Sequence, residues 1–234
     1  MTGRVGRLEQ LADGVHALHA PGLMYLGLFQ VGSRMTALRL ADGSVLLHSP
    51  VPLDVAVKDA IDAIGPVRFI VAPNLYHHLF VGDAARAWPD AAIVAPAALR
   101  KKRKDLAIAV DLESPPAAWQ GIVDVFPIAG SMLGETVLLH RPTETLVSAD
   151  LVENFSSLDH AITRAYLKLG GLYGTPGWHR MMRFVYRNKK AARASLEAML
   201  DQPFERVVVA HGEPLVNRPK ETLQQALAFL LTAR

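Results

Sequence analysis

Short apolar runs alternate with breaks rich in glycine and proline along most of the chain. Apolar runs of this length, bounded by turn-forming residues, are typical of β-strands. The pair Asp42-Gly43 between two such runs is a strong signal for a β-hairpin. The runs predict strands at residues 15–18, 35–40, 44–49, 67–72, 91–96, 122–128, 135–140, 145–150 and 206–212.

Helical periodicity fills the longer intervals between these strands. Within residues 53–65, Val55, Val57, Ile61 and Ile64 approximate a helical stripe before a Gly-Pro break. Because strands and helices alternate in both halves, with hairpins as well as crossovers, the pattern favours an α/β sandwich of mixed sheets over a doubly wound parallel sheet. Further helices are predicted between residues 72 and 91, at 162–169, 178–188 and 189–200, and from about Pro219 onward.

Composition narrows the class of protein. The 234 residues are 50% hydrophobic and 20% charged and contain no low-complexity tract, which predicts a single folded domain over residues 1–234. The chain has no cysteine, so disulfides and thiolate metal sites are excluded. Neither a signal-peptide pattern nor an apolar run long enough to span a bilayer is found, so we expect a cytoplasmic protein without a membrane partner.

Basic residues are unevenly distributed, although the net charge is only +3. No acidic residue lies between His160 and Leu196, a segment rich in arginine and lysine, and residues 100–104 read RKKRK. Such charge is typical of a solvated helix face or of a positive rim that attracts an anionic ligand. No nucleic-acid recognition signature accompanies it. We therefore expect a small-molecule substrate, with an anionic group as one option, and no nucleic acid; a homo-oligomer is compatible with the sequence.

Polar side chains follow several of the predicted strands at the point where each strand ends. The runs IVAPN, VLLHSP, LVSAD and VVVAHG show this pattern, and LYHH continues the first of them. In α/β sheets, reactive groups gather at the carboxyl ends of strands, where loops leave a rigid scaffold. Asp150 and His211 are therefore candidate metal ligands, and His77 or His78 can complete the set. Imidazole nitrogens and carboxylate oxygens suit zinc, iron or manganese.

The order of these motifs resembles that of the metallo-β-lactamase superfamily. The stretches that carry the resemblance are NLYHHLFVG (74–82), AGSMLGETVLLHRPTETLVSADLV (129–152) and VVVAHGEP (207–214). On this resemblance, Asp150 takes the position of the bridging aspartate and His211 that of the last histidine. More narrowly, the chain looks like an uncharacterised branch of the superfamily. The resemblance implies a four-layer αββα sandwich with mixed sheets.

The chain departs from the family's ligand pattern in its first two motifs. Asn74 and Tyr76 fall where the family has its first two histidines, and Leu79 falls on the third. His78 stands on an aspartate of the pattern, and Ser131 on the histidine of the second turn. An intact site of this family holds two metal ions, so these departures imply a degenerate site that keeps either a single ion or none.

The leading hypothesis is a metal-dependent hydrolase with one divalent ion, which is zinc, iron or manganese. The expected ligands are His78, Asp150 and His211, with His77 as a substitute for His78 if the loop turns differently. Such an ion would lower the pKa of a bound water and polarise the substrate. The substrate itself is not predicted, because one fold hosts many reactions.

Two residues of the first loop have candidate catalytic roles. Tyr76 is expected to hydrogen-bond a developing oxyanion, and Asn74 to orient the loop or the substrate. Asn74 is also a good turn former or helix cap without any function. The alternative hypothesis is therefore a non-catalytic protein that binds a ligand or partner on the same fold and holds no metal. A Ser–His–Asp arrangement using Ser49 or Ser131 is a third option, although no nucleophile-elbow motif is found.

Overall fold

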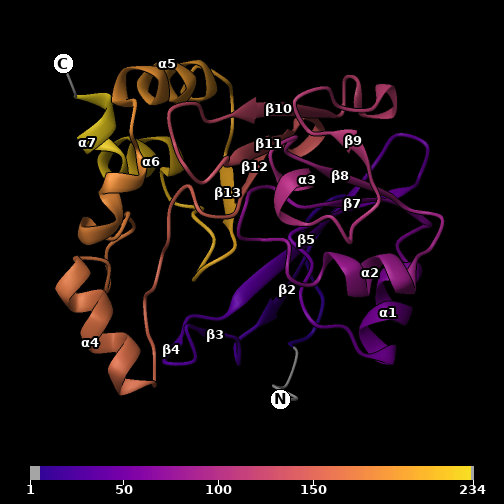
Figure 1. Ribbon diagram of the computed structural model, residues 1–234, viewed down its shortest axis with the longest axis horizontal. Helices are drawn as coiled ribbons and strands as arrows, with labels where there is room; N and C mark the ends of the chain where they lie inside the picture. The colour runs from indigo at the N-terminus through magenta and orange to yellow at the C-terminus, as the bar shows by residue number, and fades with distance from the viewer. Residues whose placement is uncertain (1–5, 233–234) are drawn as a thin grey trace.

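The computed structural model describes residues 6–232, in which helices lie on both sides of a pair of sheets (Figure 1). The larger sheet has seven strands in the order β1-β2-β5-β6-β7-β8-β9. In this sheet the pairs β1–β2, β2–β5 and β5–β6 are antiparallel, whereas β6 to β9 run parallel. These strands are β1 (Glu9–Ala12), β2 (Val15–Ala20), β5 (Ser33–Arg39), β6 (Val45–His48), β7 (Val67–Val71), β8 (Ala92–Ala95) and β9 (Ile108–Asp111).

The smaller sheet has four strands in chain order, β10 to β13. Its first pairs are antiparallel, and β12 and β13 are parallel. A separate hairpin of two short strands, β3 and β4, precedes β5. The bounds are β3 (Met24–Tyr25), β4 (Phe29–Gln30), β10 (Val123–Pro127), β11 (Thr136–His140), β12 (Thr145–Ser148) and β13 (Arg206–Val209).

The helices divide between the two sheets. Helices α1 to α3 lie on one side of the molecule and α4 to α7 on the other, with α4 beside the β3–β4 hairpin (Figure 1). None of the helices within residues 6–232 is long and apolar enough to cross a lipid bilayer. The helices are α1 (Val55–Asp62), α2 (Val81–Ala87), α3 (Leu99–Lys102), α4 (Ala161–Gly170), α5 (Lys189–Leu200), α6 (Pro219–Ala226) and α7 (Ala228–Leu231), with 3₁₀ turns η1 (Ala117–Trp119), η2 (Arg141–Thr143) and η3 (Arg180–Val185).

Alternating apolar side chains build three separate core layers. In β6, Leu46 faces the other sheet, while Val45 and Leu47 face the helices. In β11, Leu138 likewise packs between the sheets, and its neighbours pack on the outer side. Because successive strand residues point to opposite faces, both sheets are buried on both sides. The order is helices, sheet, sheet, helices, so the four-layer αββα sandwich with mixed sheets is confirmed.

The expected helix at residues 178–188 is wrong. This segment contains only η3 and otherwise lies against the loop that precedes β11. Met132 donates its backbone N–H to the Val185 carbonyl (2.9 Å), and Ser131 forms an isolated bridge with Tyr186. Backbone groups paired with a distant loop cannot also close helical turns. The helix predicted at 189–200, by contrast, is present with those bounds.

Candidate metal centre

Three of the predicted site residues meet at one edge of the sandwich. His77 follows β7, Asp150 follows β12, and His211 follows β13. Strands β6 and β7 are parallel neighbours in one sheet, and β12 and β13 are parallel neighbours in the other. The loops at their carboxyl ends therefore project to a shared rim, where each of the three side chains offers one ligand atom to a common centre.

The ligand atoms are spaced as a metal tripod requires. Nε2 of His77 lies 3.2 Å from Nε2 of His211 and 3.2 Å from Oδ1 of Asp150, and Nε2 of His211 lies 3.4 Å from the same oxygen. Ligands about 2.0–2.1 Å from a tetrahedral ion lie about 3.3–3.4 Å from one another. The separations and the donor types therefore fit a tetrahedral divalent ion with one position left open.

Both imidazoles are held so that Nε2 faces the centre. Nδ1 of His211 lies 2.9 Å from the Gly32 carbonyl oxygen, which can only accept, so Nδ1 carries the proton. Nδ1 of His77 lies 2.7 Å from Oγ of Ser49. Ser49 follows β6 in a left-handed conformation (φ 55°) that is unusual outside glycine. Such outer partners fix ring orientation in metal sites.

The three side chains form a nearly buried ion-pair network. Their side chains are only 10–13% exposed. Burial alone would raise the pKa of Asp150, but the charges and hydrogen bonds of His77 and His211 outweigh it and hold that pKa well below its usual range. Burial would lower the pKa of His211, but its hydrogen bond to Asp150 and the charges of Asp150 and Glu153 raise it. The site thus maintains an ionised carboxylate between two imidazoles.

Asn74 does not face a substrate, contrary to one of its two expected roles. It is fully buried, and Nδ2 donates to both Glu135 Oε2 (2.6 Å) and Asp150 Oδ2 (2.7 Å). Oδ1 accepts from the backbone N–H groups of Tyr76 (2.8 Å) and His77 (2.7 Å). All four hydrogen-bonding positions of the amide are therefore used inside the protein. Its loop-orienting role agrees with this geometry.

Glu135 also belongs to the site, although the sequence does not decide whether its side chain faces the site or the solvent. It precedes β11, is 1% exposed, and accepts from the Ala149 N–H (2.8 Å) as well as from Asn74. Burial and the charge of Asp150 raise the pKa of Glu135 to about 8. The only sequence signal is its place at the head of the apolar run 136–139, in the motif that also supplies Asp150.

His78 lies outside the cluster, so the structure does not support its role as a first-choice ligand. Arg103 donates from Nη1 to Nδ1 of His78 (2.8 Å) and to its carbonyl oxygen (2.9 Å). Burial and the charges of Lys102 and Arg103 lower the pKa of His78 to about 4. The turn that bonds the His78 N–H to the Tyr76 carbonyl (2.9 Å) sends adjacent side chains in different directions. His77, the substitute, occupies the place at the centre.

Tyr76 and Ser131 are not members of the His–Asp–His cluster and have other contacts among the described residues. The Tyr76 side chain is 48% exposed, and the Lys102 ammonium lies 4.9 Å from its ring centroid. Its oxyanion role stays a prediction. Ser131 Oγ accepts from the Leu133 N–H (3.1 Å). Ser49 does contact His77, but it is 1% exposed, so its hydroxyl holds the imidazole and is not presented to a substrate.

Removing the Ser49 hydroxyl is expected to weaken metal binding without unfolding the protein. For Ser49→Ala we expect a loss of about 10–100-fold in metal affinity, because the His77 ring is then free to rotate. Competition titration with a chromogenic chelator measures this loss. The matched control is Ser148→Ala, since Ser148 is equally buried and its hydroxyl bonds to none of the described residues. Equal affinities for the two variants would contradict the positioning role.

The basic segment has partners of its own. Lys168 lies over Tyr173 (5.3 Å), Arg183 over Phe229 (4.3 Å) and Arg187 over Phe184 (5.9 Å), each distance measured to the ring centroid. In the run 100–104, Arg100 pairs with Asp111 (2.7 Å). Cation–π contacts of this kind stabilise the cationic side chains against aromatic rings of the protein itself. Attraction of an anionic substrate by these residues stays a prediction.

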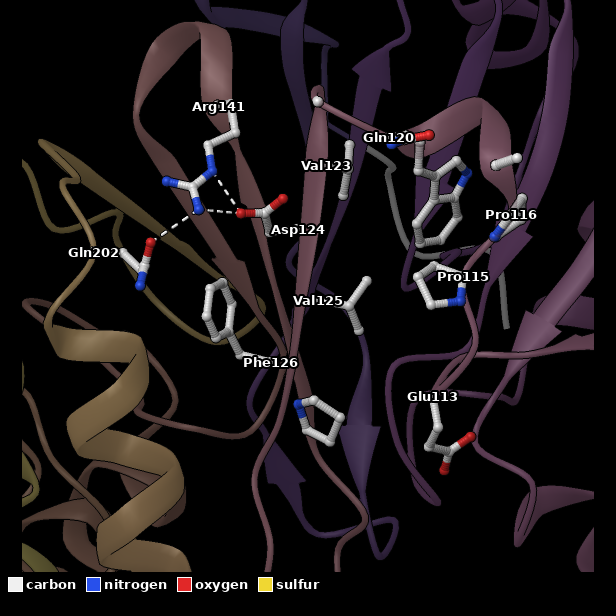
Figure 2. A pocket seen from close by; sticks show the side chains of 14 residues that line it. Glu113, Pro115, Pro116, Gln120, Val123, Asp124, Val125, Phe126, Arg141 and Gln202 are labelled. Carbon is white, nitrogen blue, oxygen red and sulfur yellow. Dashed lines mark hydrogen bonds and ion pairs between the residues drawn. The ribbon is translucent and has the colours of Figure 1, made fainter.

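A separate hollow of about 570 Å³ lies on another part of the surface (Figure 2). Pro115, Val125 and Phe126 line it, and at one side Arg141 forms an ion pair with Asp124. None of the residues that line this hollow belongs to the His–Asp–His cluster. It is therefore distinct from the candidate centre.

Comparisons with known proteins agree with this architecture. Residues 22–99 match the model of a domain of unknown function, DUF4336. No curated protein matches the sequence. Solved structures similar to the chain include the metallo-β-lactamase from Pontibacter korlensis, with a TM-score of 0.64 at 12% identity over 97% of this chain and 99% of that one.

Two further structures give the same result. The metallo-β-lactamase from Hirschia baltica has a TM-score of 0.63 at 12% identity, over 96% of this chain and 97% of that one. VMB-1 has a TM-score of 0.66 at 14% identity, over 99% of both chains. At 12–14% identity, TM-scores of 0.63–0.66 over nearly the whole chain establish a shared fold and nothing beyond it. The chain is therefore a divergent protein of the metallo-β-lactamase fold, and part of it matches a domain whose function is unknown.

Proposed function

We propose that this protein is a metal-dependent hydrolase whose single divalent ion is held by His77, Asp150 and His211. The observation that carries the proposal is the spacing of the three ligand atoms, 3.2, 3.2 and 3.4 Å apart, from three remote loops. Three protein ligands with an open position are the pattern of catalytic zinc sites. The similar structures named as metallo-β-lactamases support the same class of reaction.

The ion would supply a polarised substrate oxygen and a water of lowered pKa. Other residues of the chain orient the three ligands toward the position of the ion. His211 keeps its proton on Nδ1 against the Gly32 carbonyl, which leaves a lone pair on its Nε2. Oγ of Ser49 can accept the proton of Nδ1 of His77, and in that tautomer Nε2 of His77 also offers a lone pair. Asp150 gives Oδ1 to the centre while Asn74 holds Oδ2.

The donor set also bears on the substrate. Two neutral imidazoles and one carboxylate leave a divalent ion with a net charge of about +1. A positive centre in a nearly buried site attracts an anionic or strongly polarised group. Zinc, iron and manganese all accept this combination of nitrogen and oxygen donors. We therefore favour a small substrate with a carboxylate, phosphate or activated carbonyl group next to the bond that is cleaved.

A reconstitution assay tests the proposal. Protein purified without a histidine tag is stripped with a chelator and reloaded with zinc, iron(II) or manganese. It is then assayed with a chromogenic ester, thioester, lactam and phosphodiester. We expect at least one substrate class to be hydrolysed only after metal is added, and Asp150→Asn to abolish that activity because it removes the anionic ligand. Fully loaded protein that hydrolyses none of them would favour the non-catalytic binding protein.

A further inference from the structure

Two buried carboxyl groups converge on one nitrogen atom beside the proposed centre. Asn74 Nδ2 lies 2.6 Å from Glu135 Oε2 and 2.7 Å from Asp150 Oδ2. Asn74 is 0% exposed, Glu135 is 1% exposed and Asp150 is 8% exposed, so water does not separate these groups from one another. Buried carboxyl groups need a cation or hydrogen-bond donors to compensate for the lost solvent.

The amide that fills this position cannot rotate away. Asn74 Oδ1 accepts two backbone N–H groups of its own loop, from Tyr76 and His77. This fixes which end of the amide is the nitrogen, because the loop presents only donors to Oδ1. Both protons on Nδ2 are thus directed at the two carboxyl groups.

The same contact sets the direction of the Asp150 carboxylate. Oδ2 is held by Asn74, whereas Oδ1 lies 3.2 Å from Nε2 of His77 and 3.4 Å from Nε2 of His211. The two oxygens of Asp150 therefore differ in role. Oδ2 accepts the hydrogen bond from the Asn74 amide, and Oδ1 faces the candidate metal centre.

We propose that the Asn74 amide stands in the place of a second divalent cation, limits the centre to one ion and makes Asp150 a one-oxygen ligand. That the centre holds one ion rests on the proposed function. That the Asn74 amide excludes a second cation does not. Asn74 is a positioning residue, since it acts on the centre through Asp150 and through the loop that carries His77.

The substitution Asn74→Asp isolates the role of the nitrogen. An aspartate has nearly the same shape and still offers an oxygen to the Tyr76 and His77 N–H groups. Its second oxygen would replace Nδ2, so three carboxyl groups would converge where two protons are now donated. That arrangement is repulsive unless a cation or an additional proton neutralises it.

Equilibrium dialysis against Mn²⁺ alone, with the bound metal counted, gives the test. We expect about one ion per chain in the unmodified protein and about two in Asn74→Asp, together with a rise in Tm on adding Mn²⁺ that is larger in the variant. The control is Asn188→Asp, which adds the same charge at an exposed position where the side chain caps α5 through the Ala191 N–H (3.0 Å). This control should bind as the unmodified protein does.

The double variant Asn74→Asp/Glu135→Gln restores two carboxyl groups and should return the count to that of the unmodified protein. An Asn74→Asp protein that gains no ion and no Mn²⁺-dependent Tm overturns the inference, and so does a double variant that keeps the extra ion. If the unmodified protein binds no ion while Asn74→Asp binds one, the single-metal hydrolase fails and the inference about Asn74 stands.

Discussion

Replacing His77 by alanine is expected to remove the bound metal, whereas replacing His78 by alanine leaves it in place. His77 contributes Nε2 to the three-atom centre, but the Nδ1 atom of His78 is occupied by Arg103. Loss of one of three ligands should cost more affinity than the about 10–100-fold that follows from losing an outer partner. Metal analysis after zinc reconstitution should find about one equivalent in His78→Ala and almost none in His77→Ala.

The two variants are matched because they alter neighbouring residues of the same loop and remove the same side chain. Circular dichroism of both proteins checks that neither loses its fold. A protein that keeps its metal without His77 and loses it without His78 would contradict the geometry of the loop. That result would instead support the ligand set first expected from the sequence, which is His78, Asp150 and His211.

Gly212→Ala is expected to be the most destabilising single substitution near the centre. Gly212 follows His211 with φ +88°, and a Cβ at this position would lie 1.8 Å from the Asn154 carbonyl oxygen. The left-handed conformation alone costs about 1–2 kcal/mol for a residue with a side chain. The overlap with backbone adds to this, so the total loss should exceed about 4 kcal/mol. Urea unfolding measures it, and metal affinity should fall as His211 is displaced.

Gly174→Ala is the matched control for this backbone effect. Gly174 also has a positive φ (+73°), but a Cβ there would meet nothing within 4 Å. It should therefore show only the conformational cost of about 1–2 kcal/mol. Similar losses in the two variants would mean that the contact between Gly212 and Asn154 does not hold the His211 loop.

The fold was predictable because its periodic signals are local. Strand residues such as Val137, Leu138 and Leu139 alternate between two cores, and a run of apolar residues records burial on both sides. The helix prediction for residues 178–188 was wrong because the structure of this segment depends on a non-local contact. Its partner is the distant loop at 131–132, and no local pattern reports that pairing.

The sequence predicted which loops form the candidate site, but not which residue of the first loop contributes a ligand. Polar residues at strand ends placed Asp150 and His211 together, since the carboxyl ends of parallel strands share an edge. The choice between His77 and His78 depends on one turn and on Arg103, which lies 25 residues away from His78 in the sequence. Asn74 shows the same limit, because its four partners come from three separate parts of the chain.

The most direct test is anomalous diffraction at the zinc edge from crystals of protein reconstituted with zinc. We expect one peak about 2.0–2.2 Å from Nε2 of His77, Nε2 of His211 and Oδ1 of Asp150. A map with no peak among these atoms, or with the peak at His78, would contradict this expectation.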